Sequence, residues 1–154
     1  MTLDHQIVDT FRTVVVNQLH ETVGLSVNIT SEGIEEPPGI AVVLDFAGDI
    51  SGPITWVFPQ ELALELVRRL MADPNPSPEL AIDGATELAN ILTGRASEVF
   101  QHFGVSCEFG TPRVHEGALP AGTVVQLSTD AGSVELVLSM LVSTSRIATL
   151  LGEK

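Results

Sequence analysis

Three prolines in five positions, Pro74, Pro76 and Pro78, interrupt the middle of this chain of 154 residues. Proline lacks a backbone N–H and fixes its own φ, so no helix continues through residues 73–78, and we expect a linker there. Before and after this linker, a long helical pattern is followed by runs of strands. Strands in runs predict an α+β fold with an antiparallel sheet and exclude a parallel nucleotide-binding sheet.

The segment before the linker predicts two helices and three strands. Apolar residues recur at steps of three and four from Leu3 onward, which predicts a helix over Leu3–Val23 that ends at Gly24. A second helix is predicted over Gln60–Met71. The strands are predicted at Ser26–Thr30, Ile40–Phe46 and Ile54–Phe58, with turns over residues 31–39 and 47–53.

The segment after the linker repeats this order. Ser77 is the predicted N-cap and Pro78 the first position of a long helix that continues to residues 102–103, where Gly104 closes it. The following strands are predicted at Val105–Phe109, Thr123–Ser128 and Val134–Met140, the last two joined by a turn over residues 129–132. We therefore expect one domain over residues 1–154, with duplicated helix-strand-strand units around a shared antiparallel sheet.

The charge balance restricts the partners. The chain has 20 acidic and 7 basic side chains, a net charge of −13, and Lys154 is its only lysine. Nucleic acid and anionic lipid require clustered cations, so we expect neither as a partner. Asp4 stands where a secretion signal would be basic, and the longest apolar stretch, residues 134–142, is too short to cross a bilayer. These observations predict a cytoplasmic location.

Familiar catalytic and metal-binding motifs do not occur in the sequence. It has no phosphate loop ending in lysine, no nucleophile elbow, no His-Glu-x-x-His and no Cys-x-x-Cys. Cys107 alternates with apolar neighbours, which favours a small buried side chain over a nucleophile. The four histidines have no metal-ligand spacing, so we expect no metal or cofactor bound by this chain: His5, His20, His102 and His115.

The long helix after the linker separates polar from apolar residues. At about 100° per residue, four residues fall within about 60° of Asp83 on one face: Glu87, Asn90, Gly94 and Glu98. The opposite face, which is predicted to pack, carries Ala85, Leu88, Leu92, Ala96, Val99, Phe100 and Phe103. A polar face alone is typical of any surface helix, and solvation explains it equally well.

Two residues on this face favour contact with another protein. Gly94 costs a helix about 0.8–1.0 kcal/mol relative to alanine. On an outward face, a glycine lets the backbone of a partner approach closely. Asn90 is a poor helix former whose amide both donates and accepts hydrogen bonds without carrying a charge.

These residues resemble the signature of the CheX/CheC-type phosphatases of bacterial chemotaxis. That signature is Asp/Ser-x-x-x-Glu-x-x-Asn on a long helix, with a proline further along, and it matches Asp83, Glu87, Asn90 and Pro112. In the first helix, the residue three positions before Asn17 is Val14 instead of a glutamate. A second motif is therefore absent, and the CheX type with a single site is the nearer match.

The resemblance implies a CheC-like α+β fold and hydrolysis of the aspartyl phosphate on a CheY-like receiver domain. It implies that the receiver supplies Mg²⁺ and a lysine, that Asn90 orients the attacking water, and that Glu87 pairs with the lysine. Such a division suits a helix face without cation or nucleophile, because phosphoryl transfer depends mainly on positioning and charge stabilisation. Other expected roles are partner contact by Asp83, Gly94 and Glu98, and shaping of the strand beneath the helix by Pro112.

Three alternatives stay open. One is a receiver-binding module without catalysis, and another is a purely structural domain. A third makes Asp83 and Glu87 a divalent metal site, although two carboxylates from one helix are few ligands for a hard cation. Separately, the strand Val134–Met140 is apolar and is predicted to form a sheet edge, and the resemblance implies that such strands pair across a homodimer.

Overall fold

The structure is a computed structural model that describes residues 3–23, 27–30, 39–72, 74–129, 132–139 and 141–142. These residues form three helices: α1 (Leu3–Val23), α2 (Gln60–Met71) and α3 (Leu80–His102). They also form eight strands: β1 (Val27–Thr30), β2 (Ile40–Gly48), β3 (Ile50–Phe58), β4 (Cys107–Phe109), β5 (Arg113–His115), β6 (Thr123–Thr129), β7 (Gly132–Leu138) and β8 (Leu141–Val142).

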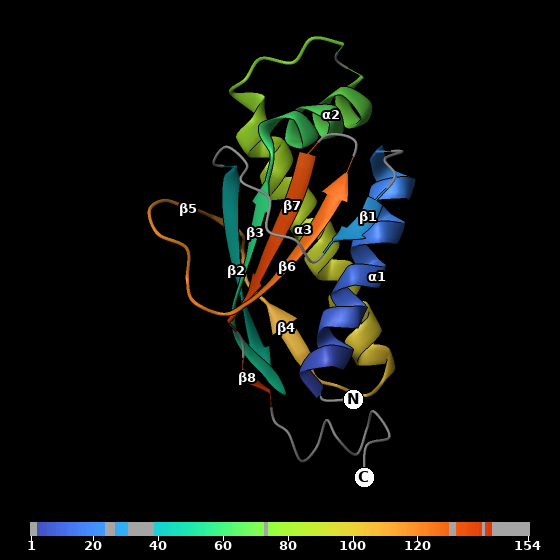
Figure 1. The fold of residues 1–154 in the computed structure, drawn as a ribbon, viewed down its shortest axis with the longest axis vertical. Helices are drawn as coiled ribbons and strands as arrows, with labels where there is room; N and C mark the ends of the chain where they lie inside the picture. Colours follow the sequence, from blue (N-terminus) through green and yellow to red (C-terminus); the bar gives the residue numbers. More distant parts are fainter. Residues whose placement is uncertain are drawn as a thin grey trace.

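The strands form one antiparallel sheet in the order β1-β6-β7-β3-β2-β4, with the short strand β5 beside β2 and β8 beside β3 (Figure 1). The two halves are related by symmetry in this order: β1 corresponds to β4, β2 to β6 and β3 to β7. If each strand is replaced by its counterpart, the same order is obtained in reverse. The first strand of each half therefore pairs with the second strand of the other half. This arrangement confirms the predicted α+β class and the duplicated unit around a shared sheet.

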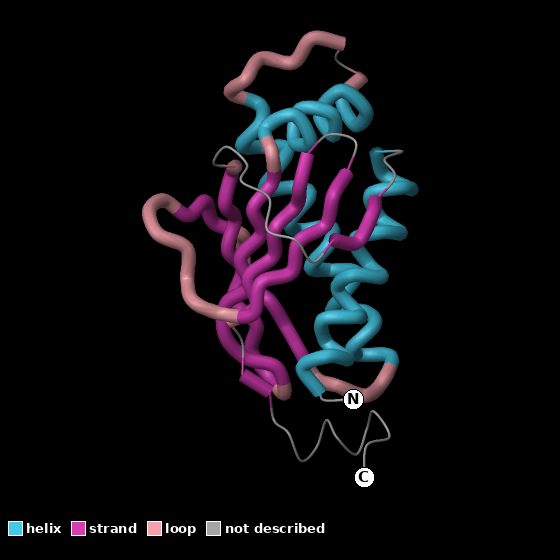
Figure 2. The backbone as a smooth tube through the Cα atoms, in the orientation of Figure 1, coloured by secondary structure: helices cyan, strands magenta, loops and turns pink. Residues whose placement is uncertain are grey.

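Helices α1 and α3 lie side by side on one face of the sheet, and α2 lies at one end of the molecule (Figure 2). The core between the layers is aromatic at its centre. The ring centroid of Phe11 lies 6.0 Å from that of Trp56 and 5.7 Å from that of Phe100, so α1, β3 and α3 meet there. Because Trp56 is fully buried, its indole N–H needs a partner, and it donates to Thr93 Oγ1 over 2.9 Å.

The helix predictions are largely confirmed. Helices α1 and α2 have the predicted bounds, and α3 ends at His102, before Gly104 with its φ of +81°. The predicted start of α3 is wrong, because the helix begins at Leu80 and its N-cap is Glu79. The chain first makes a tighter turn, in which the Leu80 N–H donates to the Ser77 carbonyl over 3.0 Å.

The predicted turn over residues 47–53 is also wrong. Strand β2 continues to Gly48 and β3 begins at Ile50, so Asp49 alone separates them. At this end the two strands take different partners: Gly48 pairs with Cys107 of β4, and Ile50 pairs with Val142 of β8. Pairing with these distant segments thus keeps residues 47–53 extended, although their Gly and Pro content predicted a turn.

Strand β7 corrects the predicted sheet edge. It ends at Leu138 and lies between β6 and β3, so both of its sides are paired. The expected route to a homodimer through this strand is therefore wrong, and among the described strands the edges are β1 on one side and β4 with β5 on the other. The predicted helix end at Gly24, the tip of the turn over 129–132, and the segment after residue 142 lie outside the described residues.

Candidate functional site

The polar face of α3 is turned away from the core as predicted. Asp83, Glu87, Asn90 and Glu98 are exposed, and Gly94 is half-buried. The packed face is also as predicted, except at Phe103, which is 48% exposed because it follows the last helical residue.

An open hollow of about 450 Å³ lies between this helix and the segment that follows β4. Its lining consists of Thr86, Glu87, Asn90, Phe109, Gly110, Thr111 and Pro112. The hollow brings Glu87, Asn90 and Pro112 together, whereas Asp83 and Glu98 are not among its lining residues. Pro112 does not lie in a strand beneath the helix, since it stands between β4 and β5 and forms part of the wall.

The wall of the hollow is attached to strand β2 on both sides. Phe109 pairs with Phe46, and four residues beyond it Arg113 pairs with Val43. Between them, the Gly110 N–H donates to the carbonyl oxygen of Asp45 over 3.1 Å. The Asp45 carboxylate also forms an ion pair with the Arg113 guanidinium, so residues 110–112 are held at both ends beside α3.

The rotation of α3 about its axis is fixed by polar contacts beneath it. Thr93 accepts the hydrogen bond of Trp56, and Gln101 Nε2 donates to Ser97 Oγ over 3.0 Å and to the Cys107 carbonyl over 3.2 Å. Because these contacts hold one side of the helix against the sheet, Glu87 and Asn90 must face outward.

Cys107 belongs to this structural layer and not to the site. It is buried, and burial raises the pKa of its thiol above the ordinary value. Its Sγ lies 3.5 Å from Ser97 Oγ. A buried thiol with a raised pKa is a poor nucleophile, which confirms the expected packing role.

The side chains of Glu87 and Asn90 make no hydrogen bond or ion pair with any part of the chain that the structure describes. The Glu98 carboxylate, in contrast, forms an ion pair with Arg95 and accepts its hydrogen bond over 3.1 Å. The carboxylate and amide at the rim of the hollow are therefore available to an outside molecule. In the described ranges, no three His, Cys, Asp or Glu side chains gather closely enough to hold a metal ion.

The two glycines inside α3 differ in what surrounds them. A Cβ at Gly84 would lie 2.4 Å from the Ala63 carbonyl oxygen, so the close contact between α3 and α2 requires glycine. A Cβ at Gly94 would meet only Phe109 Cζ at 3.6 Å, which is an ordinary van der Waals contact. The fold of this chain therefore gives no reason for a glycine at Gly94.

Helix α1 carries a second hollow, of about 420 Å³, lined by Asp9, Arg12, Thr13, Val16 and Asn17. Asn17 is exposed in it, like Asn90 in the hollow on α3. Val14, the residue three positions before Asn17, is 6% exposed and belongs to the core. The α1 hollow therefore has the amide but no carboxylate one turn before it, since Asp9 lies eight residues before Asn17 and forms an ion pair with Arg12.

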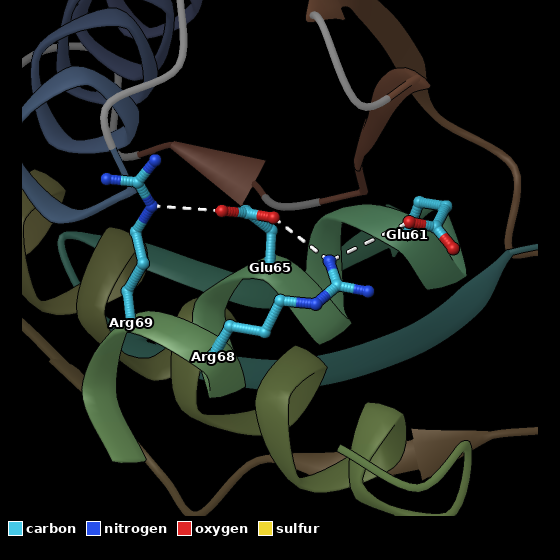
Figure 3. Close-up of polar contacts among 4 residues, drawn as sticks. All are labelled: Glu61, Glu65, Arg68 and Arg69. Atoms are coloured by element: carbon cyan, nitrogen blue, oxygen red, sulfur yellow. Dashed lines mark hydrogen bonds and ion pairs between the residues drawn. The ribbon is translucent and has the colours of Figure 1, made fainter. Parts of the chain in front are cut away.

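Helix α2 carries a charged cluster that the sequence analysis did not single out (Figure 3). Glu65 accepts from Arg68 over 3.0 Å and from Arg69 over 3.1 Å, and Arg68 also lies 3.9 Å from Glu61. Hydrogen bonds from Arg69 and Arg68 lower the pKa of the Glu65 carboxyl. The cluster keeps two of the chain's few cations on α2, outside both hollows.

The wall of the first hollow, apart from Pro112, was the part of the site that the sequence did not predict. Gly110-Thr111-Pro112 follows a predicted strand and has a composition typical of a turn, and this was the available signal.

The helices that the structure describes include none that is long and apolar enough to cross a membrane.

Residues 40–131, more than half of the chain, match the family described as the chemotaxis phosphatase CheX. The chain belongs to the CheX family. It is 30% identical over 90 residues to the CheY-P phosphatase CheX of Thermotoga maritima, a match that covers 57% of this chain and 58% of that protein. The match thus spans less than two thirds of the CheX relative.

Solved structures share the CheX fold. A chemotaxis protein CheX from Vibrio vulnificus superposes with a TM-score of 0.73 at 19% identity, covering 88% of this chain and 96% of that chain. CheX in a CheX–CheY–BeF3–Mg complex from Borrelia burgdorferi gives a TM-score of 0.67 at 16% identity, covering 86% and 96%. FliY from Thermotoga maritima gives 0.68 at 13% identity and covers all of both chains.

Proposed function

We propose that this CheX-family chain hydrolyses the aspartyl phosphate of a CheY-like receiver domain. One observation carries the proposal: Glu87 and Asn90 stand exposed at the rim of one open hollow, and neither has a partner in the described chain. Exposed polar groups that are positioned but not satisfied internally suit a site completed by another molecule.

In this proposal Asn90 orients the attacking water. The receiver holds the phosphoryl group, Mg²⁺ and a lysine, so a water in line with phosphorus is what remains to be supplied. A neutral amide can hold that water by one donated and one accepted hydrogen bond. A carboxylate at the same position would repel the phosphoryl oxygens, whereas the uncharged amide does not.

Glu87 then pairs with the lysine of the receiver and fixes the orientation in which the two proteins meet. It lies one helical turn before Asn90, so a single docked geometry places both groups. The lining of the hollow contains no lysine, arginine, cysteine or histidine. Arg113, which follows Pro112, is already paired with Asp45, and so the cation and the phosphorylated aspartate both come from the receiver, while water accepts the phosphoryl group.

The relatives support this assignment. The Thermotoga relative is named a CheY-P phosphatase, and the Borrelia structure is a complex of CheX with CheY, BeF3 and Mg. A cytoplasmic location and a homodimer belong to the same proposal. With β7 inside the sheet, a dimer would have to use another surface, and light scattering measures whether it forms.

The test is release of phosphate from the receivers of the same organism, each charged with acetyl phosphate and mixed with the purified chain. We expect faster release from at least one receiver. Binding of a charged receiver without faster release would instead identify a non-catalytic docking module. If no receiver in the whole panel shows either binding or faster release, that result would contradict the proposed function.

A further inference from the structure

Two exposed apolar side chains, Ile82 on α3 and Val114 on β5, are near the hollow but were not part of the predicted site. Ile82 is 48% exposed and Val114 is 45% exposed. A single exposed apolar residue is ordinary, whereas two next to a candidate site indicate a contact surface.

Val114 lies on the same side of the sheet as α3. It pairs with Val42, which is fully buried in the core beneath the helices. Residues directly opposite each other on paired strands project to the same face, so Val114 projects toward the layer of α3. Its exposure arises because β5 is a short strand at the open edge of the sheet.

The chain that leaves β4 runs along α3 toward the N-terminus of the helix. Phe109 Cζ lies 3.6 Å from the Cβ position of Gly94, and three residues later Pro112 lines the hollow with Thr86 and Glu87. Strand β5 therefore begins beside the N-terminal half of α3.

Ile82 and Val114 reach the same level along this path. From Pro112 to Val114 two extended residues advance about 6.6 Å. From Thr86 back to Ile82 four helical residues cover about 6 Å on one stripe of the helix. Both apolar side chains therefore lie toward the same end of the hollow, Ile82 about one and a half turns before Glu87.

We propose that Ile82 and Val114 form an apolar shoulder on which the receiver domain docks. This inference rests on the proposed function, because it takes the phosphorylated receiver as the occupant of the hollow. Neither residue lines the hollow, but each lies a few residues from one that does, Ile82 from Thr86 and Val114 from Pro112, so a receiver seated over Glu87 and Asn90 would cover the shoulder as well. Asp83 is also exposed on this part of the helix.

Electrostatics give a second reason for this occupant. The chain has a net charge of −13, and the receiver presents a phosphoryl anion. The negative charge of this chain opposes the phosphoryl anion, so we expect burial of apolar surface to add to the affinity that the pair between Glu87 and the receiver lysine provides. At the opposite end of the hollow, the space at Gly94 that this chain leaves open allows the backbone of the receiver to pass close to α3.

The experiment measures binding of a receiver charged with beryllofluoride and Mg²⁺, by titration calorimetry with the chain of 154 residues. Ile82→Ser is expected to raise Kd about tenfold and Val114→Thr about threefold, with kcat at saturating receiver unchanged. Val114→Thr keeps a β-branched residue in β5, so the strand should survive. Thermal denaturation of both variants checks the fold.

The matched control is Val124→Thr. Val124 is 53% exposed but pairs with Val137, outside the helix-covered core, so it projects to the other face of the sheet. It should leave Kd unchanged. Wild-type Kd in both shoulder variants would overturn the shoulder alone. A change of oligomeric state with unchanged Kd would assign the shoulder to a contact between copies, and failure of the wild-type chain to bind any charged receiver would overturn the proposed function with it.

Discussion

Helices α1 and α3 hold equivalent places in the duplicated fold, yet they present different chemistry. Each leads one half of the chain, covers the same face of the sheet and lines a hollow, of about 420 Å³ on α1 and about 450 Å³ on α3. Both hollows have an exposed asparagine, Asn17 or Asn90. Only on α3 does an exposed glutamate, Glu87, precede it by one turn.

The difference lies in how each half uses one helical position. On α1 that position is Val14, which contributes to the core. On α3 the residue three positions before the asparagine is Glu87, which is exposed, while its neighbours Leu88 and Ala89 are buried. A duplicated fold therefore does not imply duplicated sites, because a position used for packing cannot also supply an exposed charge.

Replacing the asparagine on each helix tests most directly whether only the hollow on α3 is active. Asn90→Ala should lower the rate of phosphate release about 10²-fold, because the water loses its orientation. Asn17→Ala is the matched control and should leave the rate unchanged. Equal rates in both variants would remove Asn90 from the mechanism.

Glu87→Ala tests the group that α1 lacks. We expect weaker binding of the charged receiver and slower release, each by roughly tenfold or more, since the pair with the receiver lysine is lost. Calorimetry and a release assay measure the two effects separately. Wild-type affinity in this variant would contradict the docking role.

Val14→Glu asks whether α1 can be converted. The new carboxylate would be buried among apolar side chains, so we expect a loss of about 2–5 kcal/mol in the free energy of unfolding and no new activity. Urea denaturation measures the loss. A stable variant with a second active hollow would show that the two helices differ only in this residue.

The glycines of α3 separate folding from docking. Gly94→Ala should stabilise the chain by about 0.5–1 kcal/mol, since the helix gains and nothing clashes, while weakening receiver binding. Gly84→Ala should destabilise it, because its Cβ would press on the Ala63 carbonyl. Tighter receiver binding by the Gly94 variant would contradict a close approach at this position.

Glu65 on α2 provides a reference outside both hollows. Its lowered folded pKa means that its contribution to stability is present above the pKa of the unfolded chain and is lost as pH falls through the folded pKa. Glu65→Gln should therefore cost at most about 1 kcal/mol near neutral pH, and the cost should disappear in acid. Receiver binding should not change. A cost that grows in acid would contradict the lowered pKa.

Local patterns predicted the helices well, because amphipathic periodicity acts within a few turns. Leu3–Val23 and Gln60–Met71 needed no distant contact to be recognised. The strand ends at Gly48 and Ile50 were missed, since their partners Cys107 and Val142 lie far along the chain. The predicted edge at β7 was wrong for the same reason, because strand order is a long-range property.

By itself, the sequence determined the outward face of α3, with Glu87 and Asn90 one turn apart, and the absence of that pair on α1. Both follow from helical geometry, which depends only on spacing along the chain. The tertiary structure alone decided that Pro112 and its neighbours form the wall of the hollow, and that Val114 pairs with Val42 at the edge of the sheet. Those relations come from pairing with β2, which joins segments that no local pattern connects.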